Sequence, residues 1–265
     1  MSRIGTRFGQ LRTKGHRGLV AYVTAGDPSP ERTPEIVWAL ERGGADVIEL
    51  GVPFSDPIAD GPVIQRASDR ALRAGMTLRA VLEIARRVRE KSEIPIVLFS
   101  YLNPLLRYGF DALACDSVRA GVDGCLITDL SVEEAEEPVA RLRAAGLDTV
   151  FLAAPTSPPR RLELVSRYST GFVYLVSRTG VTGERDQLSE SVKPLINAMR
   201  AITRLPLAVG FGISKAEQSD AAGRMADAIV VGSAFVRAIE QDGPNGEARV
   251  EQLARTLKAP LERPL

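Results

Sequence analysis

Residues 48–61 read I-E-L-G-V-P-F-S-D-P-I-A-D-G, and this stretch joins the end of an apolar strand to a loop that carries carboxylates. The strand covers residues 46–50, D-V-I-E-L, and places a glutamate among aliphatic side chains. Side chains alternate between the two faces of a strand, so Glu49 shares its face with Val47. No neighbour in sequence on that face could neutralise the glutamate. The stretch therefore predicts a carboxylate buried inside the fold.

Burial of Glu49 has two interpretations. A carboxyl group removed from water has a raised pKa, and a pKa near neutrality suits proton transfer. The alternative is a structural glutamate that an Arg or Lys elsewhere in the core holds as an ion pair, because such pairs also perturb pKa values. Taken alone, the strand leaves both interpretations open.

The rest of the chain repeats the alternation of apolar run and helical stretch. Each predicted strand is a short apolar run punctuated by Gly or Pro, a pattern typical of parallel strands covered on both faces. Eight such runs are present: 19–24, 46–50, 95–101, 124–130, 149–155, 171–178, 206–213 and 228–233. Helical periodicity lies between them, including 30–42, 63–73, 78–91, 132–145, 159–168, 188–202 and 215–223.

Strict strand and helix alternation favours parallel βαβ units, and eight units suggest a closed (β/α)8 barrel. A doubly wound open sheet is the alternative, but it would place a G-x-G-x-x-G turn after the first strand, where residues 24–28 read T-A-G-D-P. No linker or composition break divides the chain, so residues 1–265 are expected to form a single barrel domain. An extra amphipathic helix over Arg3–Lys14 is predicted to cover one end as a lid or plug.

Composition narrows the function classes. The chain has 34 Lys and Arg against 33 Asp and Glu, which gives a net charge of +1 and favours neither nucleic acid nor an acidic membrane surface as partner. No apolar run approaches the roughly 18 residues of a membrane helix, and residues 1–18 lack the apolar segment of a signal peptide. A small-molecule substrate and a cytoplasmic location are therefore expected.

Loops after the carboxyl ends of barrel strands carry the chemistry of this fold. After the seventh and eighth predicted strands lie G-F-G-I-S (210–214) and G-S-A (232–234). Glycines let backbone N–H groups approach an anion closely, and these two loops are the recurrent phosphate site of such barrels. A phosphorylated substrate is predicted.

The loop after the sixth predicted strand, residues 177–185, reads S-R-T-G-V-T-G-E-R. A long polar loop with two glycines could be slack between elements, but at the active face of a barrel a mobile lid is the better interpretation. Thr182 is the predicted latch of that lid, with Asp60 as the partner of its hydroxyl. A solvated loop residue is the alternative for Thr182.

Residue types that are scarce also constrain the mechanism. The single histidine, His16, precedes the first strand, so no His-rich metal site and no histidine base are expected, and no cofactor is predicted. The five lysines lie outside the predicted strands, where none is placed as the desolvated Schiff-base lysine of an aldolase. Acid and base chemistry is therefore assigned to Glu49, Asp60 and a third candidate, Asp129.

The stretch 48–61 resembles the signature of the tryptophan synthase α subunit family at every position. The similarity continues in A-Y-V-T-A-G-D-P (21–28), S-Y-L-N-P (100–104), S-R-T-G-V-T-G (177–183), G-F-G-I-S and G-S-A, and so spans nearly the whole chain. The resemblance implies a (β/α)8 lyase of tryptophan biosynthesis that cleaves indole-3-glycerol phosphate to indole and glyceraldehyde 3-phosphate. It also implies a β subunit partner that receives the indole within an α2β2 heterotetramer.

The resemblance assigns roles residue by residue. Glu49 and Asp60 match the catalytic positions. Matches to the phosphate-binding positions are Gly183, Gly212, Gly232 and Ser233, and matches on the indole side are Tyr22, Phe99, Tyr174 and Phe211. Tyr22 and Phe99 stand where other members often have Phe and Leu, which leaves the fit around the indole open. Asp56 and Pro57, in the middle of their loop, are expected to contact the partner subunit.

Two other functions remain as alternatives. One is a different phosphate-binding barrel enzyme, an isomerase or epimerase, although a metal epimerase would need histidines at its strand ends. The other is a catalytically silent subunit that binds the phosphate and only activates its partner. The presence of both Glu49 and Asp60 argues against a silent subunit.

Overall fold

The computed structural model describes residues 2–176, 192–210, 212–242 and 246–263. Eight parallel strands close into a barrel in which each strand pairs with its neighbours in sequence and β8 pairs with β1. The strands are β1 (Gly18–Thr24), β2 (Val47–Gly51), β3 (Ile96–Ser100), β4 (Gly124–Ile127), β5 (Asp148–Ala153), β6 (Val173–Val176), β7 (Leu207–Gly210) and β8 (Ala228–Val231). The predicted (β/α)8 barrel is therefore confirmed. That residues 1–265 form one domain stays a prediction.

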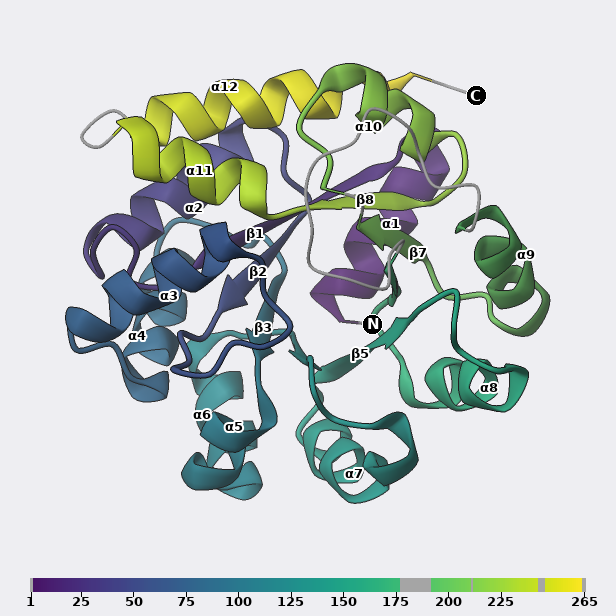
Figure 1. Ribbon diagram of the computed structural model, residues 1–265, viewed down its shortest axis with the longest axis horizontal. Coiled ribbons are helices and arrows are strands. Elements are labelled where there is room, and N and C mark those ends of the chain that lie inside the picture. Colours follow the sequence, from purple (N-terminus) through teal and green to yellow (C-terminus); the bar gives the residue numbers. More distant parts are fainter. Residues whose placement is uncertain (1, 177–191, 211, 243–245, 264–265) are drawn as a thin grey trace.

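Helices surround the strands on the outside of the barrel, except α1, which lies across one end (Figure 1). They are α1 (Arg3–Lys14), α2 (Arg32–Arg42), α3 (Pro62–Arg73), α4 (Leu78–Arg89), α5 (Leu102–Tyr108), α6 (Phe110–Ala120), α7 (Glu136–Ala144), α8 (Pro159–Tyr168), α9 (Val192–Ile202), α10 (Ala216–Gly223), α11 (Ser233–Asp242) and α12 (Gly246–Lys258). Two short 3-10 helices, Val132–Glu134 and Ala259–Glu262, complete the described elements.

Several predicted strands extend too far toward their carboxyl ends. The run 124–130, for example, is a strand only over Gly124–Ile127, and 206–213 only over Leu207–Gly210. The apolar residues beyond the strand ends, such as Leu130 and Ile213, are buried in the layer between strands and helices. Hydrophobicity alone therefore does not locate the strand ends.

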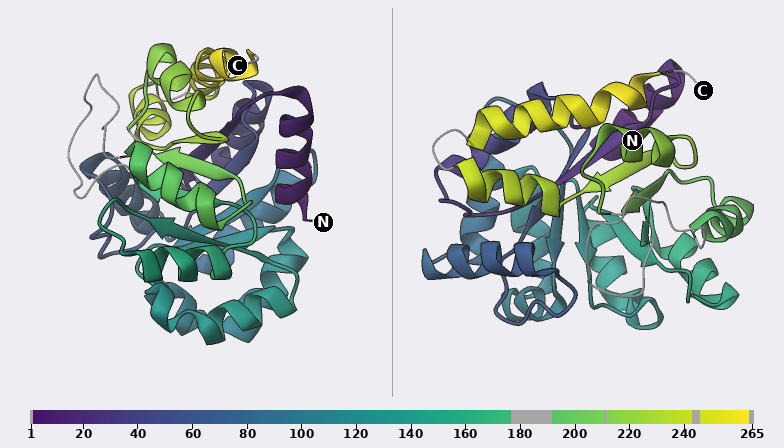
Figure 2. Two further views of the ribbon diagram at one scale, coloured as in Figure 1. Left: turned by 90° about the vertical axis from the view of Figure 1, so that its right-hand side faces the viewer. Right: turned by 45° about the horizontal axis from the view of Figure 1, so that its top comes forward.

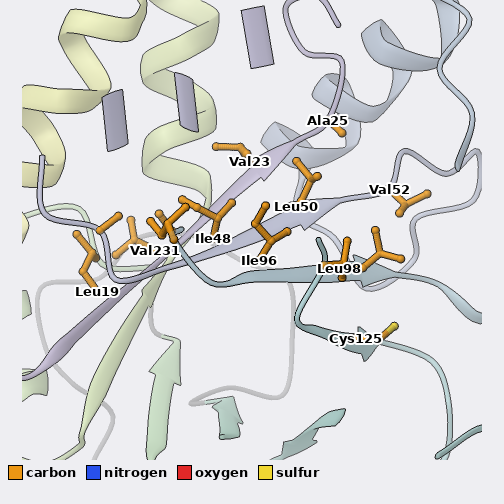
Figure 3. Packing of buried hydrophobic residues seen from close by; sticks show 14 of the residues in the cluster. Leu19, Val23, Ala25, Ile48, Leu50, Val52, Ile96, Leu98, Cys125 and Val231 are labelled. Atoms are coloured by element: carbon orange, nitrogen blue, oxygen red, sulfur yellow. The ribbon is translucent and has the colours of Figure 1, made fainter. Parts of the chain in front are cut away.

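Two layers of apolar side chains hold the barrel together. The outer layer lies between strands and helices, and Figure 3 shows Val23, Ile48, Leu50, Ile96 and Leu98 within it. Side chains that alternate with these point into the barrel and form a second cluster. Its members from the strands are Val20, Val47, Val97, Leu126, Val150, Ala208, Ala228 and Val230. This alternation fixes which strand residues face the interior.

Helix α1 seals one end of the barrel. Its buried residues Ile4, Phe8 and Leu11 recur at helical spacing and pack against the side chains that point into the barrel. A side chain at Gly18, which begins β1, would lie within 3.4 Å of Leu11 and Phe8, so α1 packs against the amino ends of the strands. Figure 2 shows α1 lying across this end of the molecule. The helix closes the amino end of the barrel. The active site is therefore expected at the opposite end, where the strands have their carboxyl ends.

Candidate active site

Glu49 lies inside the barrel. Strand β2 pairs Glu49 with Tyr22 of β1 on one side and with Val97 of β3 on the other. Its sequence neighbours Ile48 and Leu50 belong to the outer layer, so alternation turns the carboxyl group inward. Glu49 is 1% exposed. The predicted buried carboxylate is therefore present.

One oxygen of the Glu49 carboxyl group is buried without a hydrogen-bond partner in the part of the chain that the structure describes. None of the residues that the structure describes offers a hydrogen bond to Oε1, and none of their Lys or Arg side chains forms a salt bridge with Glu49. Burial raises the pKa of Glu49 to about 8. A charged carboxylate in this position would lose its hydration and gain nothing in return, so the protonated form is favoured at neutral pH. Within the described chain, the ion-pair alternative finds no support.

Asp60 is the second carboxyl group at the mouth of the barrel. It lies in the loop between β2 and α3, is 8% exposed, and accepts a hydrogen bond from the hydroxyl of Tyr101 to Oδ2 at 3.0 Å. Burial raises the pKa of Asp60 to about 6, and the hydrogen bond from Tyr101 opposes that rise. At neutral pH, Asp60 is therefore predominantly ionised while Glu49 is predominantly protonated. Two carboxyl groups with separated pKa values can take different roles.

Aromatic side chains line the space beside Glu49. The rings of Tyr22 and Phe99 meet edge to face with centroids 5.1 Å apart. The hydroxyl of Tyr22 lies 3.3 Å from the hydroxyl of Thr24, and it occupies the position that a side chain at residue 51 would need. An added Cβ on Gly51 would be 2.3 Å from that hydroxyl, so glycine here is required by the packing of Tyr22.

Tyr174 forms the facing wall from β6. It is half-buried, and its hydroxyl covers Gly210 of β7 so closely that an added Cβ there would be 2.4 Å away. Burial raises the pKa of both Tyr22 and Tyr174, and the negative charges of Asp60 and Glu49 raise them further. The structure thus brings together both carboxyl groups and three of the aromatic residues that the sequence predicted for the indole side.

A helix start provides the candidate phosphate site. Strand β8 ends at Val231, and α11 begins at Ser233 directly after Gly232. The first N–H groups of a helix have no partner within the helix, and they attract anions. At the neighbouring loop the N–H groups of Ser214 and Lys215 donate to a side-chain oxygen of Gln218 instead. The start of α11 is therefore the better anion site of the two.

Gly212 also belongs to the predicted phosphate loop. It has a φ of +69° and its position is open, with no atom within 4 Å of an added Cβ. Glycine is needed there for backbone conformation rather than for space. Of the remaining predicted residues, Thr182, Gly183 and Phe211 lie outside the described residues, as does the loop 177–185.

The loop that contains Asp56 and Pro57 forms part of the molecular surface. Asp56 is exposed and Pro57 is half-buried, while the adjacent Ile58 is 80% exposed. This loop borders a surface cavity of about 380 Å³ against α3, whose lining includes Phe54 and Leu72. An exposed isoleucine beside an open cavity is compatible with the predicted partner contact.

Two residues differ in position or role from the sequence analysis. Asp129, a candidate for acid and base chemistry, is exposed, and its Oδ1 accepts a hydrogen bond from the backbone N–H of Leu102 at the start of α5. It therefore caps a helix. Lys258 is buried rather than solvated, but it lies at the amino end of the barrel, where Nζ donates to Asp46 Oδ2 at 2.7 Å. A Schiff-base role at the opposite end is excluded by distance along the barrel.

Tyr101 is a site residue that sequence reasoning did not identify. Its motif, S-Y-L-N-P, was noted only as part of a resemblance. Only its location could have indicated a functional role. Tyr101 directly follows the carboxyl end of β3, where the functional side chains of barrels lie.

Among the described residues, no group of three or more His, Cys, Asp or Glu side chains is arranged to hold a metal ion. In the same part of the chain, no helix is both long enough and apolar enough to cross a membrane. The site is thus composed of carboxyl groups, aromatic rings and backbone N–H groups.

Comparison with known proteins gives one consistent family. The family model described as "Tryptophan synthase alpha chain" matches residues 8–262. A relative from Solibacter usitatus with that name is 65% identical over 260 residues, which cover 97% of each chain. Another, from Citrifermentans bemidjiense, is 49% identical and covers 98% of this chain and 96% of the relative.

Solved structures agree with the sequence relatives. A structure of Mycobacterium tuberculosis tryptophan synthase aligns with a TM-score of 0.92 at 36% identity and covers 99% of both chains. The tryptophan synthase subunit alpha of Legionella pneumophila aligns with a TM-score of 0.91 at 34% identity and covers 98% of both chains. Both the sequence and the fold are therefore shared along nearly the full length.

Proposed function

The chain belongs to the tryptophan synthase alpha chain family, and on that premise we propose that it is a lyase that cleaves indole-3-glycerol phosphate to indole and glyceraldehyde 3-phosphate. The observation that carries this proposal is the pair of carboxyl groups at the barrel mouth. Glu49 has a pKa raised to about 8 and Asp60 a pKa raised to about 6, so one is an acid and the other an anion at neutral pH.

Glu49 supplies the proton transfers. Retro-aldol cleavage needs a proton at C3 of the indole ring and loss of a proton from the glycerol hydroxyl next to the bond that breaks. A protonated Glu49 gives its proton to C3, and the resulting carboxylate then accepts the hydroxyl proton as the carbon–carbon bond breaks. The proton count balances, since the carboxyl group ends the cycle protonated. A pKa near the working pH allows both steps.

Asp60 stabilises the charge that develops on the substrate. Protonation at C3 makes the indole ring cationic, and the ring N–H becomes a stronger donor. An ionised Asp60 that accepts from this N–H stabilises the cation more than the neutral ring, which lowers the barrier. The walls of the indole side are Tyr22, Phe99, Tyr174 and Phe211.

The phosphate is held by backbone N–H groups around Gly232 and Ser233 at the start of α11, together with Gly212 and Gly183. Binding there fixes the glycerol chain between the helix start and Glu49. The loop 177–185 closes over the bound substrate, with Thr182 as its latch to Asp60. No metal or organic cofactor enters these steps.

The name of the family implies a β chain partner, and the proposed assembly is an α2β2 heterotetramer in the cytoplasm. Asp56 and Pro57 lie on the exposed loop directly before Asp60. A partner bound to this loop would therefore couple to the catalytic carboxylate through only a few residues, and indole would pass across that contact.

The test is release of indole from indole-3-glycerol phosphate by the purified chain, with and without a β subunit. We expect indole and glyceraldehyde 3-phosphate in equal amounts, at a higher rate with the β subunit. Binding of the substrate with no indole formed in either case would contradict the proposal and identify a catalytically silent subunit. Conversion to an isomer would identify a different barrel enzyme.

A further inference from the structure

Tyr101 bridges the catalytic loop at two consecutive residues. Its hydroxyl donates to Asp60 Oδ2 at 3.0 Å and accepts from the backbone N–H of Ala59 at 2.9 Å. The residue is 3% exposed, and its hydrogen bond to Asp60 is buried. A single hydroxyl thus joins the carboxyl end of β3 to the loop that carries Asp60.

The direction of both hydrogen bonds is fixed by chemistry. A backbone N–H can only donate, so the hydroxyl of Tyr101 must accept from Ala59. The one proton of that hydroxyl then points to Asp60. This hydrogen bond fills one acceptor site of Oδ2 and so restricts the rotation of the carboxylate, while its remaining lone pairs can accept from a ligand. The arrangement favours the ionised carboxylate, which is the stronger acceptor.

The phenol ring of Tyr101 is held on its other sides as well. The ring of Phe54, from the same loop, lies with its centroid 5.1 Å away. The backbone carbonyl of Tyr101 accepts from the hydroxyl of Ser100 at 2.9 Å, and Tyr101 itself is the residue before the first turn of α5. A donor fixed to rigid elements can orient a carboxylate that lies on a loop.

We propose that Tyr101 is a positioning residue for the cleavage reaction, which holds Asp60 ionised and orients its carboxylate to accept from the indole N–H. This inference rests on the proposed function. Tyr101 acts through Asp60 and is not assigned contact with the reacting atoms. Removal of its hydroxyl should leave the pocket shape intact and change the charge state and orientation of Asp60.

Within the described chain, Tyr22 from β1 and Tyr174 from β6 interact electrostatically with Asp60, and both also interact with Glu49 from β2. Burial raises the pKa of each of these groups, so all three are neutral near pH 6. In that range, the contact from Tyr101 is therefore the main stabilising influence on the charge of Asp60. A change in the acidic limb of the pH profile reports on this contact.

The first variant is Tyr101→Phe, assayed for indole release between pH 5 and pH 9. We expect kcat to fall by about tenfold with KM changed by less than about twofold, because one charge-assisted hydrogen bond is lost in the transition state. We also expect the acidic limb of the kcat/KM profile to move up by about one pH unit, since the pKa of Asp60 rises when its donor is removed.

The second variant replaces Tyr101 by 3-fluorotyrosine, which nearly keeps the volume and makes the hydroxyl a stronger donor. It should move the acidic limb down, opposite in sign to Tyr101→Phe. The matched control is Tyr108→Phe, which also removes a phenol hydroxyl bound to a carboxylate, in this case Asp116 Oδ2 at 2.6 Å on α6. That control should leave the profile unchanged.

Opposite shifts in the two variants, with an unchanged control, would support the inference. A lower kcat without any shift of the acidic limb would show a merely structural role and overturn it, as would unchanged kinetics. The pKa of Asp60 in both variants is also read by carbon NMR without substrate. If the wild-type chain released no indole, the proposed function would fail, and this NMR titration would still accept or reject the contact.

Discussion

Asp46 directly precedes β2 and Glu49, three residues further on, is the middle residue of that strand; both are 1% exposed. Asp46 accepts hydrogen bonds from the side chains of Arg7 and Lys258 and from the backbone N–H of Leu19, each at 2.7 Å. Glu49 has no such partner among the described residues for Oε1. Equal burial therefore produces a structural anion at one end of the barrel and an acid at the other.

At the amino end of the barrel, where Asp46 lies, the same hydrogen-bonding arrangement is repeated. A side chain within three residues before each even-numbered strand accepts from a backbone N–H at the start of the preceding odd-numbered strand. Besides Asp46, Asp123 accepts from the N–H of Ile96 at 2.8 Å, Thr170 from Thr149 at 2.9 Å, and Asp227 from Leu207 at 2.8 Å. Asp123 is also paired with Arg89 at 2.7 Å. Asp46 and Asp123 at the amino end are thus held by cations and backbone N–H groups, whereas Oε1 of Glu49 has no hydrogen-bond partner among the described residues.

Glu49→Gln tests the reactive end and carries the largest expected effect. Glutamine keeps the shape of the side chain but has no proton to transfer, so kcat should fall by about a thousandfold, equivalent to about 4 kcal/mol. Affinity for a non-cleaved substrate analogue should stay within about twofold. The measurement is indole release together with analogue titration. Wild-type turnover in this variant would remove Glu49 from the mechanism.

Asp46→Asn tests the satisfied end. It leaves the buried ammonium of Lys258 without its counter-charge, so we expect the free energy of unfolding to fall by about 3 kcal/mol in a urea titration. The exposed Asp56→Asn is the control, with a change below about 0.5 kcal/mol. A loss below about 1 kcal/mol for Asp46→Asn would show that the ion pair contributes little to closing the barrel.

Urea titrations of Glu49→Gln at several pH values test how the free energy of unfolding depends on the protonation of Glu49. The pKa of Glu49 is about 8 in the folded chain and about 4.5 when unfolded, so the folded state binds more protons between these values. Wild-type stability from this group is complete below about pH 4.5 and is lost as the pH rises through about 8. The Gln variant should therefore equal the wild type near pH 4.5 and exceed it by a few kcal/mol above pH 8.

Much of this contrast was readable in the sequence, and part of it was not. The alternation of Val47, Ile48, Glu49 and Leu50 predicted an inward glutamate, because the period of a strand is fixed. Sequence could not show whether a cation would meet it, since Lys258 is more than 200 positions away in the chain and reaches Asp46 instead. Long-range pairing depends on closure of the barrel.

Loops limited the prediction for a related physical reason. Asp129, like Asp60, follows a strand at its carboxyl end, yet its carboxylate accepts from the backbone N–H of Leu102 at the start of α5. Tyr101 gave no signal beyond its location, because its role depends on a contact with Asp60 across 41 residues. Side-chain direction after a strand end is set by the loop conformation, which periodicity does not determine.

Asp60→Asn asks whether charge or shape matters at the mouth of the barrel. The amide can still accept a hydrogen bond but cannot offset the positive ring, so kcat should fall on the order of a hundredfold. The wild-type kcat/KM profile should be bell-shaped, with limbs at about pH 6 from Asp60 and about pH 8 from Glu49. The residual activity of the variant should lack the acidic limb. Unchanged turnover would make Asp60 a positioning group only.

The smallest expected effect is on phosphate affinity, and it is tested by comparing Gly232→Val with Lys215→Ala. Even a bare Cβ at residue 232 would lie 3.5 Å from Cβ of Tyr22, so the branched side chain of valine would crowd the start of α11. We expect binding of glycerol 3-phosphate, followed by calorimetry, to weaken by about tenfold. Lys215→Ala should change it by less than about twofold, because backbone N–H groups hold the anion. The reverse ranking would assign the phosphate to a basic side chain.

The most direct test of an unpaired, protonated Glu49 is its own titration. Carbon NMR of chain labelled at the glutamate carboxyl carbons, compared with the Glu49→Gln variant, isolates the signal of this residue. We predict that it titrates with a pKa of about 8, because burial favours the neutral acid and no described residue bonds to Oε1. A signal that titrates near the ordinary glutamate pKa of about 4.5 would contradict the account.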